Sequence, residues 1–389
     1  MKKHKTKNRI DSAPGSAVVS LAKCADYDSA HVHNAMQSLL QPLGGLENYV
    51  SRGDKVHLKI NLLSAKDPKR AITTHPAVIE SVVRTVQDIG ATVQIGDSPA
   101  GAVKGLQRYW DNCGITDLAK RTGAKIVALE TGGVVKHQIG DHLYHVSKHV
   151  VESDVVINLP KIKTHGLTLY TGAIKNLFGT IPGLRKSEYH KQAPHPEDFA
   201  EILVDIYSII RPQLTIADAI VGMEGNGPST SGRPRHIGIL LASEDCVALD
   251  AIAAHIMGFK ENEIDTTVSA TKRGLGISEL GNIEIEGVEL EELRIKDFQL
   301  PSNRLIKLIP RRLMFMVAKL VWVRPRPIAD VCKRCGACVK NCPVQAISED
   351  ETGLPIIDYD LCIKCMCCDE VCQHNAMEQE MSWIAKKLS

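Results

Sequence analysis

The chain has 389 residues, a length that predicts two or three domains. Basic residues (47 Lys and Arg) almost balance acidic residues (45 Asp and Glu), and aromatic residues make up only 4% of the chain. A net charge of +2 gives no general attraction to nucleic acid or to an anionic membrane, and few aromatic rings are present to stack on bases. Nucleic acid is therefore not an expected partner, and any basic site must be local.

Residues 1–16 begin with a basic run that is not followed by the apolar stretch of a signal peptide. We expect a disordered basic tail and a cytoplasmic protein without a transmembrane segment. The cysteines would then lie in a reducing compartment, where metal ligation is commoner than disulfide formation. Nine of the twelve cysteines follow Val331, which indicates a metal-binding module near the C-terminus.

From Ala17 to about Met257, short β-branched runs alternate with longer stretches of helical periodicity. This alternation is typical of a mostly parallel sheet covered by helices, so the predicted fold class is α/β, with helices on both faces of the sheet. Helices are expected at Pro76–Ile89 and Asp198–Ile210. The expected strands are Ala17–Lys23, Lys55–Asn61, Thr92–Asp97, Lys125–Ala128, Asp154–Asn158, Leu214–Asp218 and His236–Ala242.

The α/β domain is expected to span residues 17–300, followed by a linker helix segment at 301–327. The linker is rich in Leu, Ile, Met and Val, but it also contains Lys307, Arg311, Arg312 and Lys319. It therefore cannot be a membrane-spanning helix, which needs about 20 apolar residues. We interpret it as a helix that docks the C-terminal module onto the main domain. A basic amphipathic helix that lies on a membrane is the alternative.

Two runs of cysteines follow at residues 328–379, and a short tail at 380–389 ends the chain. The spacing of each run matches the pattern that wraps a cubane iron–sulfur cluster, in which three cysteines hold one cluster and the fourth holds the other. We predict two [4Fe-4S] clusters. The first would be held by Cys332, Cys335, Cys338 and Cys372, and the second by Cys362, Cys365, Cys368 and Cys342. Zinc would leave half of these thiols without a purpose.

Residues from about Ile328 to Met377 resemble the bacterial two-cluster ferredoxins, which implies a small α+β module. Two departures from the pattern stand in the second run. Gln373 replaces the proline that follows the fourth cysteine of the first run, which would alter the local turn and the potential. Cys367 is an additional thiol, which could hydrogen-bond beside the ligands, serve as an alternative ligand, or be a small buried residue.

Six short blocks occur in order within the α/β region. They are Lys59–Asn61, Thr73–Pro76, Gly96–Pro99, Asn158–His165, Thr171–Asn176 and Gly222–Pro228. Together they resemble the family catalogued as domain of unknown function 362, over about Lys55 to Met257. The resemblance implies an architecture and an active face, and members of that family often end in ferredoxin-like clusters. It implies no particular reaction.

Most of these blocks follow predicted strands, and the carboxyl ends of parallel strands meet at one edge of a sheet. We therefore expect a shared cleft whose amines and imidazoles bind a carboxylate or a phosphate. The predicted catalytic residues are Lys59, His75, Lys161, Lys163, His165 and Lys175. The predicted substrate-binding residues are Asn61, Asp97, Ser98, Asn158, Thr171, Asn176, Glu224 and Asn226.

Each of these residues also has an ordinary structural interpretation. A lysine after a strand is often solvated or paired with an aspartate, and His75 before Pro76 could simply begin a helix. Metal binding by His75 and His165 is a further alternative. Thr168 and Thr171 are expected to cap the helix that continues to Phe178. Three further cysteines, Cys24, Cys113 and Cys246, lie in apolar segments and are expected in the core.

The leading hypothesis is an oxidoreductase that relays low-potential electrons through the two clusters. An external ferredoxin or reductase would donate them, and an anionic small molecule in the α/β cleft would accept them. The alternative is a non-catalytic electron carrier, or a protein that binds and delivers iron–sulfur clusters.

Overall fold

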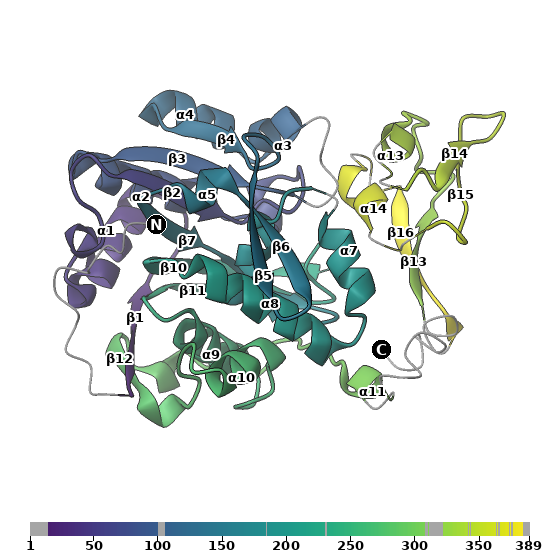
Figure 1. Cartoon of the computed structure of the whole chain (residues 1–389). Helices are drawn as coiled ribbons and strands as arrows, with labels where there is room; N and C mark the ends of the chain where they lie inside the picture. The colour runs from purple at the N-terminus through teal and green to yellow at the C-terminus, as the bar shows by residue number, and fades with distance from the viewer. Residues whose placement is uncertain are drawn as a thin grey trace.

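The structure is a computed structural model that describes residues 15–99, 106–183, 185–229, 232–307, 310, 322–340, 342, 344–362, 364, 366–372, 374 and 376–383. The expected tails at 1–16 and 380–389 lie largely outside these residues, as does the middle of the expected linker helix. Figure 1 shows an α/β body and, at its side, a smaller C-terminal module coloured yellow-green to yellow.

One sheet of ten strands forms the α/β body in the described residues, in the order β12-β1-β11-β10-β7-β2-β3-β4, with β8 beside β10 and β9 beside β8. Strands β10, β7, β2, β3 and β4 run parallel, and β11 is antiparallel to β1 and β10. The predicted α/β fold with a mostly parallel sheet is confirmed. The strands are β1 Ala17–Lys23, β2 Lys55–Ile60, β3 Thr92–Asp97, β4 Lys125–Ala128, β7 Val155–Leu159, β8 Lys161–His165, β9 Leu169–Thr171, β10 Leu214–Gly225, β11 Gly232–Ser243 and β12 Ile283–Gly287.

Helices cover both faces of this sheet (Figure 1). Alternate residues of a strand point to opposite faces, so Val155 and Ile157 of β7 enter one core while Val156 enters the other. The first core contains α1, α2, α3 and α4, and the second contains α6, α8, α9 and α10. The helices of the body are α1 Ser29–Leu40, α2 Pro76–Asp88, α3 Leu106–Asn112, α4 Ile115–Thr122, α5 Lys148–Val151, α6 Ala173–Asn176, α7 Arg185–Gln192, α8 Pro196–Ile210, α9 Cys246–Met257 and α10 Asp265–Lys272.

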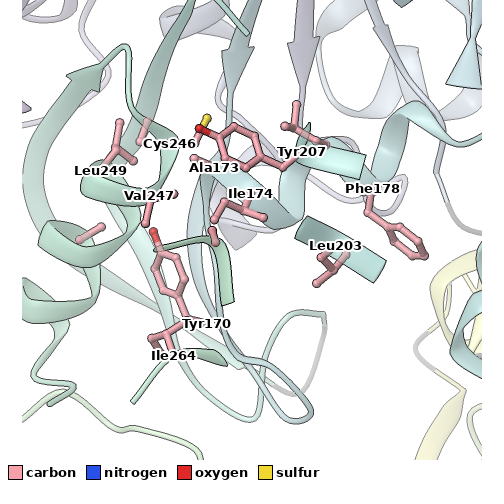
Figure 2. Packing of buried hydrophobic residues seen from close by; sticks show 14 of the residues in the cluster. Tyr170, Ala173, Ile174, Phe178, Leu203, Tyr207, Cys246, Val247, Leu249 and Ile264 are labelled. Atoms are coloured by element: carbon pink, nitrogen blue, oxygen red, sulfur yellow. The ribbon is translucent and has the colours of Figure 1, made fainter. Parts of the chain in front are cut away.

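The second core is built around α8 and α9. Figure 2 shows Leu203 and Tyr207 of α8 near Ile174 of α6 and Val247 of α9. Cys246 lies in the same cluster, and Cys24 and Cys113 are buried in the first core, so the expectation that these three cysteines are core residues is confirmed.

Helix α2 illustrates how the local sequence sets an element. His75 is its N-cap, and His75 Nδ1 accepts a hydrogen bond from the backbone N–H of Ala77. Pro76 takes the first helical position, where its missing N–H costs nothing. The buried residues then recur at helical spacing, at Val78, Ile79, Val82, Val83 and Val86. The helix therefore starts at the edge of the sheet where β2 ends.

Two expectations about strand ends were wrong. Lys161 to His165 were expected in a loop after β7, but they form β8, which pairs with β10. Asp218 was expected to end its strand, but β10 continues to Gly225. Both differences have one reason. Strand β10 continues beyond Asp218 because it pairs with β11 up to Gly225, and this continuation is also a pairing partner for β8. The side chains of Lys161, Lys163 and His165 consequently share one face of a strand.

A second hairpin, β5 Val134–Ile139 with β6 His142–Ser147, stands apart from the main sheet. In the C-terminal module, β13 Val323–Pro327 pairs with β16 Met377–Met381, and β14 Ile347–Glu349 pairs with β15 Pro355–Ile357. Short helices α13 Ala337–Lys340 and α14 Cys367–Val371 complete the module. Its sheet thus includes the end of the segment expected to be a linker.

Of the segment expected to be a linker helix, the beginning forms α11 Arg304–Lys307 and the end forms β13, so the expectation of a helix up to residue 327 was wrong. Among the residues that the structure describes, no helix is long and apolar enough to cross a membrane.

Candidate functional site

Lys59 and Asp97 form a buried ion pair at the ends of β2 and β3. The distance between Lys59 Nζ and Asp97 Oδ1 is 2.8 Å, and the Lys59 side chain has no exposed surface. Burial lowers the pKa of Lys59, and Asp97 opposes this effect. Lys59 also donates to the carbonyl of Ile60, at 2.6 Å. Gly179 packs so closely on this pair that a Cβ there would lie 2.0 Å from Asp97 Oδ1.

Lys161 and Asp218 form a second buried ion pair, with 2.9 Å between Lys161 Nζ and Asp218 Oδ2. Tyr27 completes this group, because its hydroxyl donates to Asp218 Oδ1 at 2.9 Å and accepts from Lys161 Nζ at 2.6 Å. The Tyr27 ring stacks on His75, with 3.6 Å between ring centroids. Burial, together with the charge of Asp218, raises the pKa of Tyr27. This arrangement gives Lys161 and Tyr27 a short path for moving a proton.

His75 lies beside this group as the N-cap of α2. Its backbone N–H donates to Asp218 Oδ2 at 2.9 Å. Burial lowers the pKa of His75 to about 4, so its imidazole is neutral at pH 7. The structural interpretation of His75 as the residue that begins α2 is confirmed.

Lys163 reaches into the loop at residues 61–75, which follows β2. Its Nζ donates to Asn61 Oδ1 and to the carbonyl of Ile72, both at 2.7 Å. The loop is itself fixed, because the backbone N–H of Leu62 donates to Asp97 Oδ2 at 2.6 Å. Lys163 and Lys59 are therefore linked through this loop.

His165, Lys175 and Thr171 lie near Lys163, and we call these four residues the β8 basic cluster. Thr171 is the cross-strand partner of Lys163, so the two side chains share a face. Burial lowers the pKa of His165 well below its ordinary value, and the positive charges of Lys175 and Lys163 contribute. The Thr171 hydroxyl is buried and finds no hydrogen-bond partner among the described residues. A buried hydroxyl of this kind normally has a protein, water or ligand partner.

The expectation that Thr168 and Thr171 cap the following helix was wrong. Helix α6 has no side-chain cap from its N-cap residue, Gly172. Asp250 of α9 caps it instead, by accepting hydrogen bonds from the backbone N–H groups of Ala173 at 2.6 Å and Ile174 at 3.0 Å. Asp250 could not be identified from the local sequence because it lies far along the chain.

Two of the four predicted asparagines, Asn158 and Asn176, connect α6 to the ends of β7 and β2. Asn176 Nδ2 donates to Asn158 Oδ1 at 2.8 Å and to the carbonyl of Lys59 at 3.2 Å. Ser98 Oγ accepts from Lys186 Nζ at 2.8 Å. Sequence reasoning missed Lys186 and Tyr27, which contact predicted residues from distant segments.

Glu224 and Asn226 lie at the far end of β10. Glu224 is buried and accepts a hydrogen bond from the backbone N–H of Gln299 at 3.2 Å, whereas Asn226 is exposed.

The C-terminal module contains a cavity lined by four of the predicted cluster ligands: Cys332, Cys335, Cys338 and Cys372. Burial raises the pKa of the Cys338 thiol to about 11, and Cys372 and Cys332 add to this effect because they lie close by. Four thiols that converge on one cavity fit the donor set of an iron–sulfur cubane.

The predicted ligands of the second cluster are described only in part, because Cys365 lies outside the described residues. Cys342, Cys362 and Cys368 pack in one apolar cluster with Ile347 and Ile357. Nothing is described of the Cys367 side chain, and its role stays open. Cys338 and Cys372, predicted ligands of the first cluster, pack against the same apolar cluster, so this packing brings described thiols of both sets together.

The two cysteine runs repeat the same backbone geometry. The N–H of Arg334 lies 3.4 Å from Cys332 Sγ, and the N–H of Lys364 lies 3.4 Å from Cys362 Sγ. Both Arg334 and Lys364 have positive φ, of 53° and 56°. Such loops point backbone N–H groups toward the sulfurs, as iron–sulfur sites require. Two residues later the runs differ, since Gly336 (φ 66°) is replaced by Met366 (φ 60°).

The module contacts the α/β domain at the C-terminal end of α14. Lys66, in the loop at residues 61–75, donates to the carbonyl of Cys372 at 2.7 Å. Arg108 of α3 donates to the carbonyl of Val371 at 3.1 Å. A predicted cluster ligand is therefore bonded directly to the loop that also supplies two acceptors of Lys163.

The fold and the cysteine-lined cavity define an α/β protein joined to an iron–sulfur binding module. The chain belongs to the family described as "Domain of unknown function (DUF362)", whose model matches residues 56–255. A second model, described as "4Fe-4S binding domain", matches residues 325–348. The resemblances drawn from the sequence blocks and from the cysteine spacing are thereby confirmed.

Three known proteins illustrate these similarities. The thylakoid-associated protein sll1697 of Synechocystis sp. is 37% identical over 66% of this chain and 79% of its own length. Pyruvate synthase subunit PorD of Methanocaldococcus jannaschii is 45% identical over 14% of this chain and 67% of its own. The solved lactate racemase apoprotein of Thermoanaerobacterium thermosaccharolyticum is 12% identical, with a TM-score of 0.38 over 59% of this chain and 54% of that chain.

Proposed function

We propose that this protein is an oxidoreductase that passes low-potential electrons, through two [4Fe-4S] clusters, to an anionic small molecule at the β8 basic cluster. An external ferredoxin or reductase would supply the electrons. One observation carries the proposal: Lys66 donates to the carbonyl of Cys372, and the same loop contacts Lys163. The cysteine module and the basic residues are thus parts of one connected site.

The clusters would supply one-electron transfer at low potential when bound. Cys332, Cys335, Cys338 and Cys372 would hold the first cluster, which the shared cavity supports. Cys362, Cys365, Cys368 and Cys342 would hold the second. Because these ligands must remain reduced thiols, we also propose a cytoplasmic location.

In the α/β domain, Lys163 and Lys175 would bind the anion through their positive charge, and the neutral His165 would contribute a ring N–H, since such donors suit carboxylate and phosphate oxygens. Thr171 and Asn61 would orient it. Lys161 and Tyr27, with 2.6 Å between Nζ and the hydroxyl oxygen, would hold a proton that neutralises the charge added on reduction. His75 would pack against Tyr27 and keep it in place.

The remaining predicted residues would act around this centre. Lys59 and Asp97 would fix the start of the loop at residues 61–75 through Leu62. Asn158 and Asn176 would hold α6 against the strand ends. Ser98, Glu224 and Asn226 are retained as proposed substrate contacts.

Anaerobic reoxidation tests this function. The full-length protein, loaded with clusters and reduced, would be mixed with candidate carboxylates and phosphates while the visible absorbance of the clusters is followed. The proposal expects reoxidation with at least one of them, and a loss of about tenfold or more in rate when Lys175→Met removes a cation from the site. Lys136→Met, which removes an exposed lysine of β5, is the matched control. Failure of every anion to reoxidise the clusters would contradict an enzymatic role.

The second candidate is a non-catalytic electron carrier or a cluster-delivery protein. The observation that favours it is the complete burial of Lys59 and Lys161 in ion pairs with Asp97 and Asp218, which leaves these two lysines to stabilise the sheet. Transfer of intact clusters to an apo-ferredoxin, without any reaction of bound anions, would support this candidate.

A further inference from the structure

We infer that Lys66 and Arg108 are positioning residues through which the α/β domain raises the reduction potential of the cluster that Cys372 ligates. The inference requires the cysteine module to bind its clusters, as proposed above, but it does not require the reduction of an anion. The two proposals can therefore fail separately.

The contact is made at the end of α14, where a helix leaves carbonyl groups without intrahelical partners. Arg108 donates to the carbonyl of Val371 at 3.1 Å, and Lys66 donates to the carbonyl of Cys372 at 2.7 Å. Cationic donors are favoured at this end of a helix. Two consecutive carbonyls of the module are thus bonded to side chains of the other domain.

The backbone that carries Lys66 is held firmly. Cys113 Sγ lies 3.3 Å from the carbonyls of Ser64 and Lys66, and Asn112 Nδ2 donates to the carbonyl of Ala65 at 3.1 Å. Cys113 is fully buried, so these contacts are shielded from water. A fixed backbone lets the Lys66 side chain determine where Cys372 lies.

Lys66 places its amino group beside the backbone of a predicted cluster ligand, with 2.7 Å between Lys66 Nζ and the carbonyl oxygen of Cys372. Reduction adds one negative charge to a cluster, and a nearby cation in a partly buried setting stabilises the reduced state. Lys66 should therefore raise the potential, and Arg108 should act in the same direction.

The same loop also carries two acceptors of Lys163, which are the Asn61 side chain and the carbonyl of Ile72. Next to Asn61, the backbone N–H of Leu62 donates to Asp97. A change in charge at Cys372 would consequently act on a segment that also positions the β8 basic cluster.

Redox titration of the full-length, cluster-loaded protein tests the inference, with the clusters followed by electron paramagnetic resonance and no substrate added. Lys66→Met should lower the potential of one cluster by an amount that changes its equilibrium constant by about tenfold, which is about 59 mV for one electron. Lys66→Arg, which keeps the charge, should restore most of the wild-type potential. Lys69→Met removes an exposed lysine of the same loop and is the control.

Iron and sulfide content would first be matched between the variants. Should Lys66→Met lose iron, Arg108→Gln tests the neighbouring contact and should shift the same cluster in the same direction. Wild-type potentials in Lys66→Met, or in Arg108→Gln where Lys66→Met loses iron, would overturn the inference. So would equal shifts in Lys66→Met and Lys69→Met, because a local contact cannot explain them.

Discussion

Asp97 accepts a hydrogen bond from the backbone N–H of Leu62 through one carboxylate oxygen, at 2.6 Å, while its other oxygen is paired with a buried lysine. The carboxylate therefore links β2, β3 and the start of the loop at residues 61–75. This loop connects the basic residues of the sheet to the cysteine module, and the predictions below test its parts.

Removing one partner of the buried ion pair between Lys59 and Asp97 should destabilise the protein, because the other partner would remain buried and charged. Lys59→Met would leave a buried carboxylate without its cation, and we expect a loss of about 3–5 kcal/mol in the free energy of unfolding. Adding Asp97→Asn should recover part of this loss. Anaerobic urea denaturation followed by circular dichroism measures both.

Lys120 and Asp117 provide the control, because their ion pair is exposed and 3.6 Å long. Lys120→Met should change stability by less than about 1 kcal/mol. Equal effects of Lys59→Met and Lys120→Met would contradict the importance of the buried pair.

Gly179 should tolerate no side chain. A Cβ at this position would lie 2.0 Å from Asp97 Oδ1 and 2.7 Å from Lys59 Nζ, so Gly179→Ala must displace the ion pair. We expect destabilisation of about 1–3 kcal/mol, measured by the same denaturation. Gly281→Ala is the matched control, since a Cβ there meets nothing within 4 Å. An unchanged free energy of unfolding in Gly179→Ala would show that the ion pair can move without cost.

His57 should make the protein less stable in acid. It is fully buried, neither ring nitrogen has a partner in the described residues, and burial lowers its pKa from 6.5 to about 3. Below pH 6.5, His57 binds a proton in the unfolded chain but stays neutral in the folded protein. The free energy of unfolding therefore falls as the pH drops from about 6.5 to about 3.

At pH 5 this single group should cost about 2 kcal/mol relative to pH 7.5. His57→Leu should remove that part of the pH dependence, which urea denaturation at the two pH values would show. An unchanged difference between the two pH values would mean that His57 is protonated in the folded protein.

The iron content of single cysteine variants should distinguish cluster ligands from cysteines of the core. Cys372→Ser should lower the iron content from about eight atoms per chain toward about four, because one cluster loses a ligand. Cys246→Ser should leave the iron content unchanged, since Cys246 is buried in the α/β core far along the chain from the module. Iron analysis of anaerobically prepared protein measures the content of both variants. Full iron content in Cys372→Ser would require another ligand, for which Cys367, the additional thiol of the second run, is the candidate that the sequence offers.

Strands with strong β-branched patterns were predicted at their observed limits, as β1, β3 and β4 show. Strand β8 was missed because its alternate residues, Lys161 and Lys163, carry charges that normally indicate solvent. Burial of these charges depends on partners supplied by distant segments, Asp218 and the carbonyl of Ile72. The sequence therefore singled out many of the polar residues that the fold brings together, whereas their pairing depends on the tertiary fold.

The contacts of Tyr27 and Lys66 could not be predicted for the same reason. Each is an ordinary residue in its local sequence, and each gains its role from a residue far along the chain, Asp218 and Cys372. The spacing of the cysteines, by contrast, is local information, and it predicted the 4Fe-4S binding domain correctly.

The two cysteine runs place different residues, Gly336 and Met366, in the same left-handed backbone conformation. Met366 adopts a left-handed conformation that Gly336 adopts without steric cost, and a residue with a Cβ pays about 1–2 kcal/mol for it. The halves of a duplicated module are therefore no longer equivalent. Such asymmetry leaves the second run with a backbone strain that the first run does not carry.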